Sequence, residues 1–292
     1  MGATLKFNLP SGLIALNPEN VNAKITDFIA AGPDKLHLVT DWDRTITANG
    51  GGRDITSWGV VQSLLPPEGQ VIDNTLYELY QPKELGGTMS ESEALLWWQE
   101  SLALHVRYGT NVHDVETAVA KVGMLPRKGA KSSKDQEGLF DVCTRLHIPT
   151  IILSAGVRSV IECVTRRYDI SPTAILATNL RIADDGCIIG WDEKTLIHNF
   201  NKHERGHEEL AAIRRDRPKA ILLGDSNDDA QMVAGTNNVL RIRIYDKPIN
   251  SSSAYVDKLS KASIAVGYDL LVEGSFLPVV KLIQLMSEPG RN

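Results

Sequence analysis

Four short apolar runs constrain the fold of this 292-residue chain more than any other feature. Each run is rich in Leu, Ile, Val or Ala and stops abruptly at polar, turn-prone residues. The runs are KLHLVT before Asp41, PTIILS before Ala155, TAILAT before Asn179 and KAILLG before Asp225. Runs of this kind, alternating with helical patterns, are typical of parallel strands buried on both faces of a sheet. The sequence therefore predicts an α/β fold.

Helical patterns occur between these strands and in one long interval without strand signals. Outside that interval we predict three helices, over Val157–Tyr168, His203–Arg215 and Phe276–Ser287. Within it, Glu91–Tyr108 indicates one long helix that includes Trp97 and Trp98. We therefore predict a mainly helical insertion, residues 48–131, in an α/β core that comprises residues 1–47 and 132–292.

The segment that returns from the insertion, PRKGAKSSKDQEG at Pro126–Gly138, is rich in Gly, Ser and charge. Such composition is typical of a hinge or linker. We interpret its basic residues as solvated, with a contact to a substrate phosphate as the alternative; they are Arg127, Lys128, Lys131 and Lys134.

Composition limits the partners of the protein. A formal net charge of -5 and a pI near 5.8 provide no broad positive field, so we expect neither nucleic-acid nor membrane binding. No apolar run approaches the roughly 20 residues of a membrane-spanning helix. The three cysteines show no CxxC spacing, which favours reduced thiols and a cytoplasmic location.

Polar residues follow three of the predicted strands, and parallel strands bring such positions to one edge of the sheet. Asp41 and Asp43 stand two positions apart after the first strand, a spacing that suits attack on a phosphate ester. Asp41 would act as nucleophile and metal ligand, while Asp43 would protonate the leaving oxygen and later activate water. The alternative for this pair alone is an ordinary turn or helix cap.

Taken together, four segments resemble the haloacid dehalogenase (HAD) superfamily. DWDRTIT matches its first motif through Asp41, Asp43, Thr45 and Thr47, ILSAG its second, and LLGDSNDD its fourth. LIHNFNKH is similar to cytosolic pyrimidine 5′-nucleotidases and places the family's lysine at Lys202. The resemblance implies a Rossmann-like core with a helical cap, Mg²⁺, an aspartyl-phosphate intermediate and a monomer. The implied substrate is a small phosphorylated metabolite. Among such metabolites, the resemblance favours a pyrimidine nucleoside 5′-monophosphate.

The resemblance also assigns roles to individual residues. The metal ligands would be Asp41, the carbonyl of Asp43, and Asp225, since Mg²⁺ prefers oxygen ligands. The phosphate would be bound by Ser154, Ala155, Gly156 and Lys202, with the backbone N–H groups at a helix N-terminus. Thr45 and Asp229 would support the site. The family's cap residues include an acidic side chain that contacts the base, which the sequence does not place.

Three other interpretations compete with this reading. A phosphoserine-type phosphatase has the same core motifs, and a silent binding module would keep the fold without turnover. HERGH, at His203–His207, matches the HExxH zinc-peptidase pattern, although Gly206 and polar flanks favour an exposed helical face for His203 and His207.

Trp97 and Trp98 are interpreted as packing residues, with stacking on a base as the alternative. Adjacent helical positions point in different directions, so only one of the two would face a ligand.

Overall fold

A seven-stranded sheet forms the centre of the protein in a computed structural model that describes residues 8–48, 55–248 and 254–288. The strand order is β1-β9-β8-β7-β2-β3-β4, and only β1 runs antiparallel to its neighbour. The strands are β1 (Leu13–Ala15), β2 (Leu36–Thr40), β3 (Thr150–Val157), β4 (Ala174–Thr178), β7 (Lys219–Gly224), β8 (Val239–Tyr245) and β9 (Leu270–Glu273). The four apolar runs are β2, β3, β4 and β7, as predicted.

Strand β2 lies in the middle of the sheet between β7 and β3, and all five of its residues are buried. Its side chains alternate between two apolar clusters, with Leu38 in one and Val39 in the other. The carboxyl ends of β7, β2 and β3 therefore meet at one edge, which is where a parallel sheet presents its ligand site.

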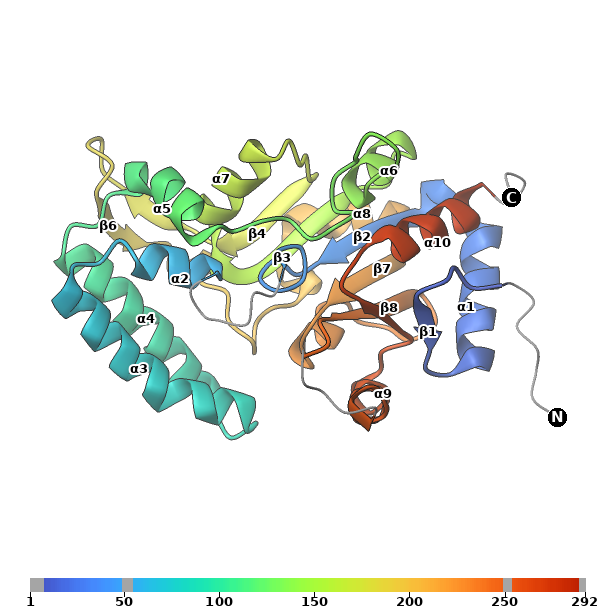
Figure 1. The fold of residues 1–292 in the computed structure, drawn as a ribbon, viewed down its shortest axis with the longest axis horizontal. Helices are drawn as coiled ribbons and strands as arrows, with labels where there is room; N and C mark the ends of the chain where they lie inside the picture. The colour runs from blue at the N-terminus through green and yellow to red at the C-terminus, as the bar shows by residue number, and fades with distance from the viewer. Residues whose placement is uncertain (1–7, 49–54, 249–253, 289–292) are drawn as a thin grey trace.

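Helices cover both faces of the sheet (Figure 1). Phe28, Phe140 and Ile283 from three of these helices pack in the same cluster as Leu38. Leu210 and Met232 close the other face over Val39. The helices outside the insertion are α1 (Pro18–Ala31), α6 (Leu139–Arg145), α7 (Arg158–Arg167), α8 (Ala211–Asp216), α9 (Ala254–Val266) and α10 (Leu277–Ser287). The short 3₁₀ turns are η1 (Pro33–Lys35), η2 (Val112–Asp114), η3 (Glu193–Thr195), η4 (Glu204–Gly206), η5 (Glu208–Leu210) and η6 (Asp228–Gln231).

The interval without strand signals is helical: it holds α2 (Ser57–Gln62), α3 (Pro67–Leu85), α4 (Glu91–Arg107) and α5 (Val115–Val122). Figure 1 shows α3 and α4 as a hairpin that projects beside the sheet edge. A capping box starts α4, because Ser90 and Glu93 exchange hydrogen bonds. A hairpin of β5 (Leu180–Ile182) and β6 (Ile188–Trp191), which the sequence did not predict, packs on α4. The division into two domains at residues 47 and 131 stays a prediction.

The start of the return segment is packed rather than solvated. Pro126 pairs with Thr47, and Arg127 as a whole residue is 3% exposed, so the solvated interpretation of Arg127 was wrong. Gly129 has φ +79°, and a Cβ there would lie 2.8 Å from the backbone nitrogen of Leu277. Only glycine fits this close approach. The segment is thus held between the loop after β2 and the start of α10.

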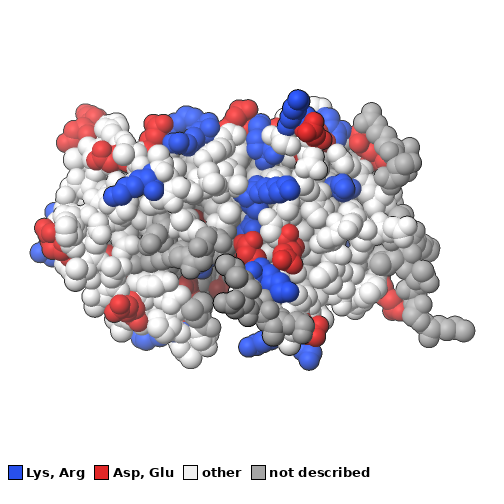
Figure 2. Space-filling model, in the orientation of Figure 1, with Lys and Arg blue, Asp and Glu red and all other residues white. Residues whose placement is uncertain are grey.

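The predicted helices over Val157–Tyr168 and Phe276–Ser287 are confirmed as α7 and α10, each within one residue of the predicted ends. The predicted helix over His203–Arg215 was wrong in its first half, which forms two 3₁₀ turns before α8. Among the described residues no helix is long and apolar enough to span a membrane. On the face in Figure 2, acidic and basic side chains are mixed rather than gathered into a field of one sign.

Candidate active site

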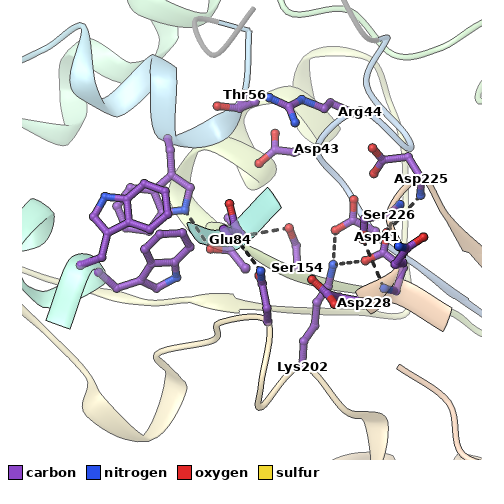
Figure 3. Close-up of a pocket in the computed structure, with 18 of the residues that line it drawn as sticks. Asp41, Asp43, Arg44, Thr56, Glu84, Ser154, Lys202, Asp225, Ser226 and Asp228 are labelled. Atoms are coloured by element: carbon purple, nitrogen blue, oxygen red, sulfur yellow. Dashed lines mark hydrogen bonds and ion pairs between the residues drawn. The ribbon is translucent and has the colours of Figure 1, made fainter. Parts of the chain in front are cut away.

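Asp41 follows the central strand directly and is buried at the sheet edge. Its backbone N–H donates to Leu223 O at 3.0 Å, which continues the pairing of β2 with β7, and the residue is 5% exposed. Lys202 Nζ donates to Asp41 Oδ1 at 2.5 Å and to Asp229 Oδ1 at 2.7 Å. Figure 3 shows the Lys202 side chain directed at Asp41. The structure therefore brings together the predicted nucleophile and lysine, which lie 161 residues apart.

The Lys202 ammonium is held by two buried carboxylates. Burial alone would lower the pKa of Lys202, but Asp229 and Asp41 raise it well above the ordinary value. Burial would likewise raise the pKa of Asp229, yet Lys202 and the N–H of Ser226 lower it. The pair is thus an ammonium and a carboxylate at neutral pH, which leaves a fixed positive charge beside Asp41.

Asp43, in the loop that follows β2, is held by Ser57 in the first turn of α2. Ser57 donates to both carboxylate oxygens, through its N–H at 2.7 Å and its hydroxyl at 2.5 Å. Burial raises the pKa of Asp43, while the bonds from Ser57 oppose the shift. A Cβ at Gly156 would lie 2.2 Å from Ser57 Oγ, so glycine is required where β3 passes this pair. Ser57 was not among the residues predicted from the sequence.

The loop after β7 supplies two further carboxylates. Asp229 Oδ2 accepts from the N–H groups of Asp225 and Ser226 at 3.0 and 2.9 Å, and Thr45 Oγ1 donates to Asp225 Oδ1 at 3.2 Å. A Cβ at Gly224 would lie 2.3 Å from Asp229 Cβ, so the last residue of β7 must be glycine. Asp229 therefore orients Asp225. Thr45 connects Asp225 to the loop of residues 41–47 that follows β2, which we call the nucleophile loop.

The carboxylates of this edge fit a divalent cation. Oxygens of Asp41, Asp225 and Asp229 lie within 4.8 Å of one another, and no other His, Cys, Asp or Glu cluster of this kind occurs in the described ranges. Burial and the neighbouring carboxylates raise the pKa of Asp225 to about 8, and burial raises that of Asp41 to about 7. A cation would relieve this repulsion. The predicted carbonyl ligand from Asp43 stays a prediction.

Ser154, Ala155 and Gly156 line the same cavity, but not at a helix N-terminus as we expected. Strand β3 continues to Val157, which pairs with β4 after a register shift, so α7 begins only at Arg158. Gly156 N–H donates to Ser154 Oγ at 3.1 Å, and Ala155 O accepts from Trp58 Nε1 at 2.9 Å. The Ser154 hydroxyl therefore faces the cavity from a strand.

The opposite wall of the cavity, whose volume is about 520 Å³, comes from the helical segment and from Asn199. Its aromatic rings pack together: Trp97 and Trp98 lie 4.6 Å apart edge-on, and Trp58 lies 5.2 Å from Trp98. Both Trp97 and Trp98 border the cavity, although we expected only one to face it. They are also packing residues, since each is at most 9% exposed.

Two polar groups on this wall were not placed from the sequence. Glu84, near the end of α3, accepts from Asn199 Nδ2 at 2.6 Å, and burial raises its pKa. In Figure 3 Glu84 lies across the cavity from Asp225. Ser101 Oγ on α4 is buried against the cavity and has no hydrogen-bond partner among the described residues. Unpaired buried hydroxyls are costly, so this one is available to a ligand.

The HERGH segment does not form a zinc site. Glu204 is 2% exposed and bonds His37 Nε2 at 3.3 Å, with Arg214 as a second partner. His203 lies in a 3₁₀ turn region and its Nδ1 contacts Gln231 O at 3.0 Å. Two His ligands on one α-helical face, which the zinc-peptidase pattern requires, are therefore absent from this described segment. The expected helical face for His203 and His207 was also wrong, because this segment forms 3₁₀ turns; His203 is exposed, as expected, whereas Glu204 is buried.

Comparisons with known proteins identify the family of this chain. The sequence model of the family described as pyrimidine 5′-nucleotidase (UMPH-1) matches residues 44–261. A 7-methylguanosine phosphate-specific 5′-nucleotidase of Drosophila melanogaster is 26% identical over 258 residues, which cover 82% of this chain and 79% of that protein. The Gallus gallus protein of the same name is 27% identical over 271 residues, covering 88% and 89%.

Solved structures share the fold. Cytosolic 5′-nucleotidase IIIB bound to cytidine has a TM-score of 0.76 at 22% identity, with 94% of this chain and 95% of that chain covered. A substrate-bound phosphoserine phosphatase has a TM-score of 0.51 at 15% identity, with 85% and 97% covered. The chain thus has the fold of HAD-superfamily phosphatases. Within that class, the chain belongs to the pyrimidine 5′-nucleotidase family, as its motifs indicated.

Proposed function

We propose that the protein is a Mg²⁺-dependent 5′-nucleotidase that works through a phosphorylated Asp41. The observation that carries this proposal is that Asp41, Lys202 and Asp225 come together in the lining of one cavity. Bound Mg²⁺, held by Asp41, Asp225 and the Asp43 carbonyl, would neutralise charge on the nucleophile and the phosphate. The Asp cluster and the raised pKa values of Asp41 and Asp225 support such a cation.

In the first step Asp41 attacks phosphorus and the ester P–O bond breaks. Asp43 donates a proton to the departing 5′ oxygen; burial, which raises its pKa, favours the protonated form that this step needs. Ser154 and the Ala155 N–H bind phosphate oxygens opposite Lys202. In the second step Asp43 takes a proton from water, water attacks the phosphoaspartate, and inorganic phosphate leaves with Asp41 regenerated.

The helical wall supports a nucleoside as the rest of the substrate. Trp58, Trp97 and Trp98 offer aromatic faces, and Glu84 and Ser101 offer polar groups within the same cavity. We infer two substrates from the comparisons: a pyrimidine nucleotide such as CMP, and 7-methylguanosine 5′-monophosphate, whose methylated base is cationic. Aromatic faces with a carboxylate suit a cationic base. The name of the cytosolic relative supports a cytoplasmic location for this chain.

The proposal is tested by exchanging the nucleophile. Asp41→Asn should abolish phosphate release from p-nitrophenyl phosphate and from nucleotides, and should remove the phosphoenzyme trapped by acid quench of the native protein. Near-native turnover in this variant would exclude Asp41 as the nucleophile.

A panel of CMP, UMP, AMP, GMP, 7-methylguanosine monophosphate and phosphoserine decides the substrate class. Preference for phosphoserine would support the phosphoserine-type alternative. Absence of turnover with every ester at any metal concentration would support the silent binding module.

A further inference from the structure

Arg127 is a buried cation outside the cavity that bonds the backbone of the nucleophile loop. Its Nε donates to Thr45 O at 3.0 Å and its Nη2 to Arg44 O at 2.7 Å. The side chain is 2% exposed, and Arg127 is not among the residues that line the cavity. A phosphate contact, the alternative raised from the sequence, is therefore not its role in this arrangement.

Asp246, just after β8, balances this charge. Arg127 Nη1 and Nη2 donate to its two carboxylate oxygens at 2.6 and 2.8 Å, the two-pronged geometry in which guanidinium groups bind carboxylates most strongly. A buried guanidinium without such a partner would be very costly. The pair thus joins the return segment, the nucleophile loop and the end of β8.

The backbone of the return segment adds to the same attachment. Arg127 N–H donates to Ile46 O at 2.7 Å, and Ala48 N–H donates to Leu125 O at 3.1 Å. The two segments therefore form a short antiparallel ladder. The bonds that connect these two segments involve residues 44–48 of the loop, directly after Asp43.

The loop that is held in this way is conformationally unusual. Arg44 has φ +65°, a left-handed conformation that side chains other than glycine rarely adopt. Its N–H donates to Thr47 Oγ1 at 2.9 Å and its carbonyl accepts from Arg127. Such strain persists only where surrounding bonds fix it. Because Asp43 immediately precedes Arg44, these bonds also fix the direction of the Asp43 backbone and side chain.

We propose that Arg127 and Asp246 form a positioning pair for Asp43, so that the segment returning from the helices sets the geometry of acid–base catalysis. This inference rests on the proposed phosphatase mechanism. Neither residue touches the reacting atoms; both act through the loop at residues 44–47.

The dependence on leaving group tests this role. An alkyl phosphate such as glycerol 2-phosphate needs a proton on its leaving oxygen, whereas p-nitrophenyl phosphate releases a stable anion. Arg127→Met should therefore lower kcat/KM for glycerol 2-phosphate by about 100-fold, and for p-nitrophenyl phosphate by less than about 10-fold. Asp246→Asn and Arg127→Lys should show the same pattern with smaller losses.

Arg145→Met is the matched control, because Arg145 forms a comparable two-pronged pair with Glu137 on the surface, with Glu288 as a further partner. It should leave both kcat/KM values and their ratio unchanged. If Arg127→Met does not fold by circular dichroism, Arg127→Lys and Asp246→Asn decide the question. Equal losses for the two esters in the folded variants would overturn the proposal and leave the pair a purely structural one.

The failure of the proposed function is distinguishable from failure of this inference. Neither test ester carries a base, so absence of nucleotide turnover would refute only the proposed substrate. Absence of turnover with both esters in the native protein would overturn the phosphatase mechanism and the positioning role together.

Discussion

The two walls of the cavity are built on different principles. At the sheet edge, Asp41 and Asp225 follow neighbouring strands, and Lys202 is held by charge between carboxylates. On the helical side, tryptophan rings pack on one another, and Glu84 on α3 accepts a hydrogen bond from Asn199. Sheet register and charge thus fix the reacting groups, whereas side-chain packing shapes the space for the rest of the substrate. Changes at the edge should affect every ester, and changes at the wall should affect selection.

Lys202→Met should give the largest effect, because it removes the ammonium that lies 2.5 Å from Asp41. Loss of a charge aimed at the transferring phosphate in a buried site costs about 10³-fold in kcat/KM. The loss should be similar for CMP and p-nitrophenyl phosphate in steady-state assays. Lys258→Met on the exposed side of α9 is the control and should be neutral. A loss confined to nucleotides would instead make Lys202 a recognition residue.

Glu84→Gln should give a smaller and selective effect, because glutamine keeps the shape but removes the charge from the wall. We expect kcat/KM for 7-methylguanosine monophosphate to fall about 10-fold, equivalent to about 1.4 kcal/mol. Hydrolysis of p-nitrophenyl phosphate should be unchanged, and CMP should change less than the methylated nucleotide. Glu78→Gln, on the exposed side of the same helix, is the matched control. A parallel loss on p-nitrophenyl phosphate would place Glu84 in the chemistry.

The residues of the sheet edge could be predicted because each follows a recognisable apolar run. The topology of the sheet then places these residues together, because parallel strands bring Asp41, Ser154 and Asp225 to one edge whatever lies between them in the sequence. Ser57 and Glu84 could not be found in this way. Thr56 and Ser57 have the composition of a helix start, but nothing local shows that the helix would begin beneath Asp43.

The local sequence led to a wrong prediction for residues whose environment depends on a distant partner. Arg127 stands in a charged, glycine-containing segment, yet its carboxylate partner is 119 residues away. Glu204 sits within an apparent metal motif, yet it is buried against His37, 167 residues earlier in the chain. A buried charge is stable only with its partner, and partners so distant cannot be read from neighbouring residues.

The helical wall should also respond to acid through His105 on α4. The side chain is 1% exposed, its Nδ1 contacts Thr110 Oγ1 at 3.1 Å, and burial lowers its pKa from 6.5 to about 4. Below pH 6.5 the His105 imidazole binds a proton in the unfolded chain but stays neutral in the folded chain. The contribution of the neutral His105 to the free energy of unfolding is therefore fully present above pH 6.5, and it is lost as the pH falls towards 4.

His105→Gln separates this contribution from all others. Between pH 7.5 and 5.0 the native protein should lose about 2 kcal/mol more free energy of unfolding than the variant, at about 1.4 kcal/mol per pH unit below 6.5. Urea unfolding followed by tryptophan fluorescence at the two pH values measures the difference, since three tryptophans lie in the wall. His113→Gln, at an exposed histidine, should behave as the native protein does. Equal losses in native protein and His105→Gln would show that the buried imidazole does not set the acid sensitivity of the wall.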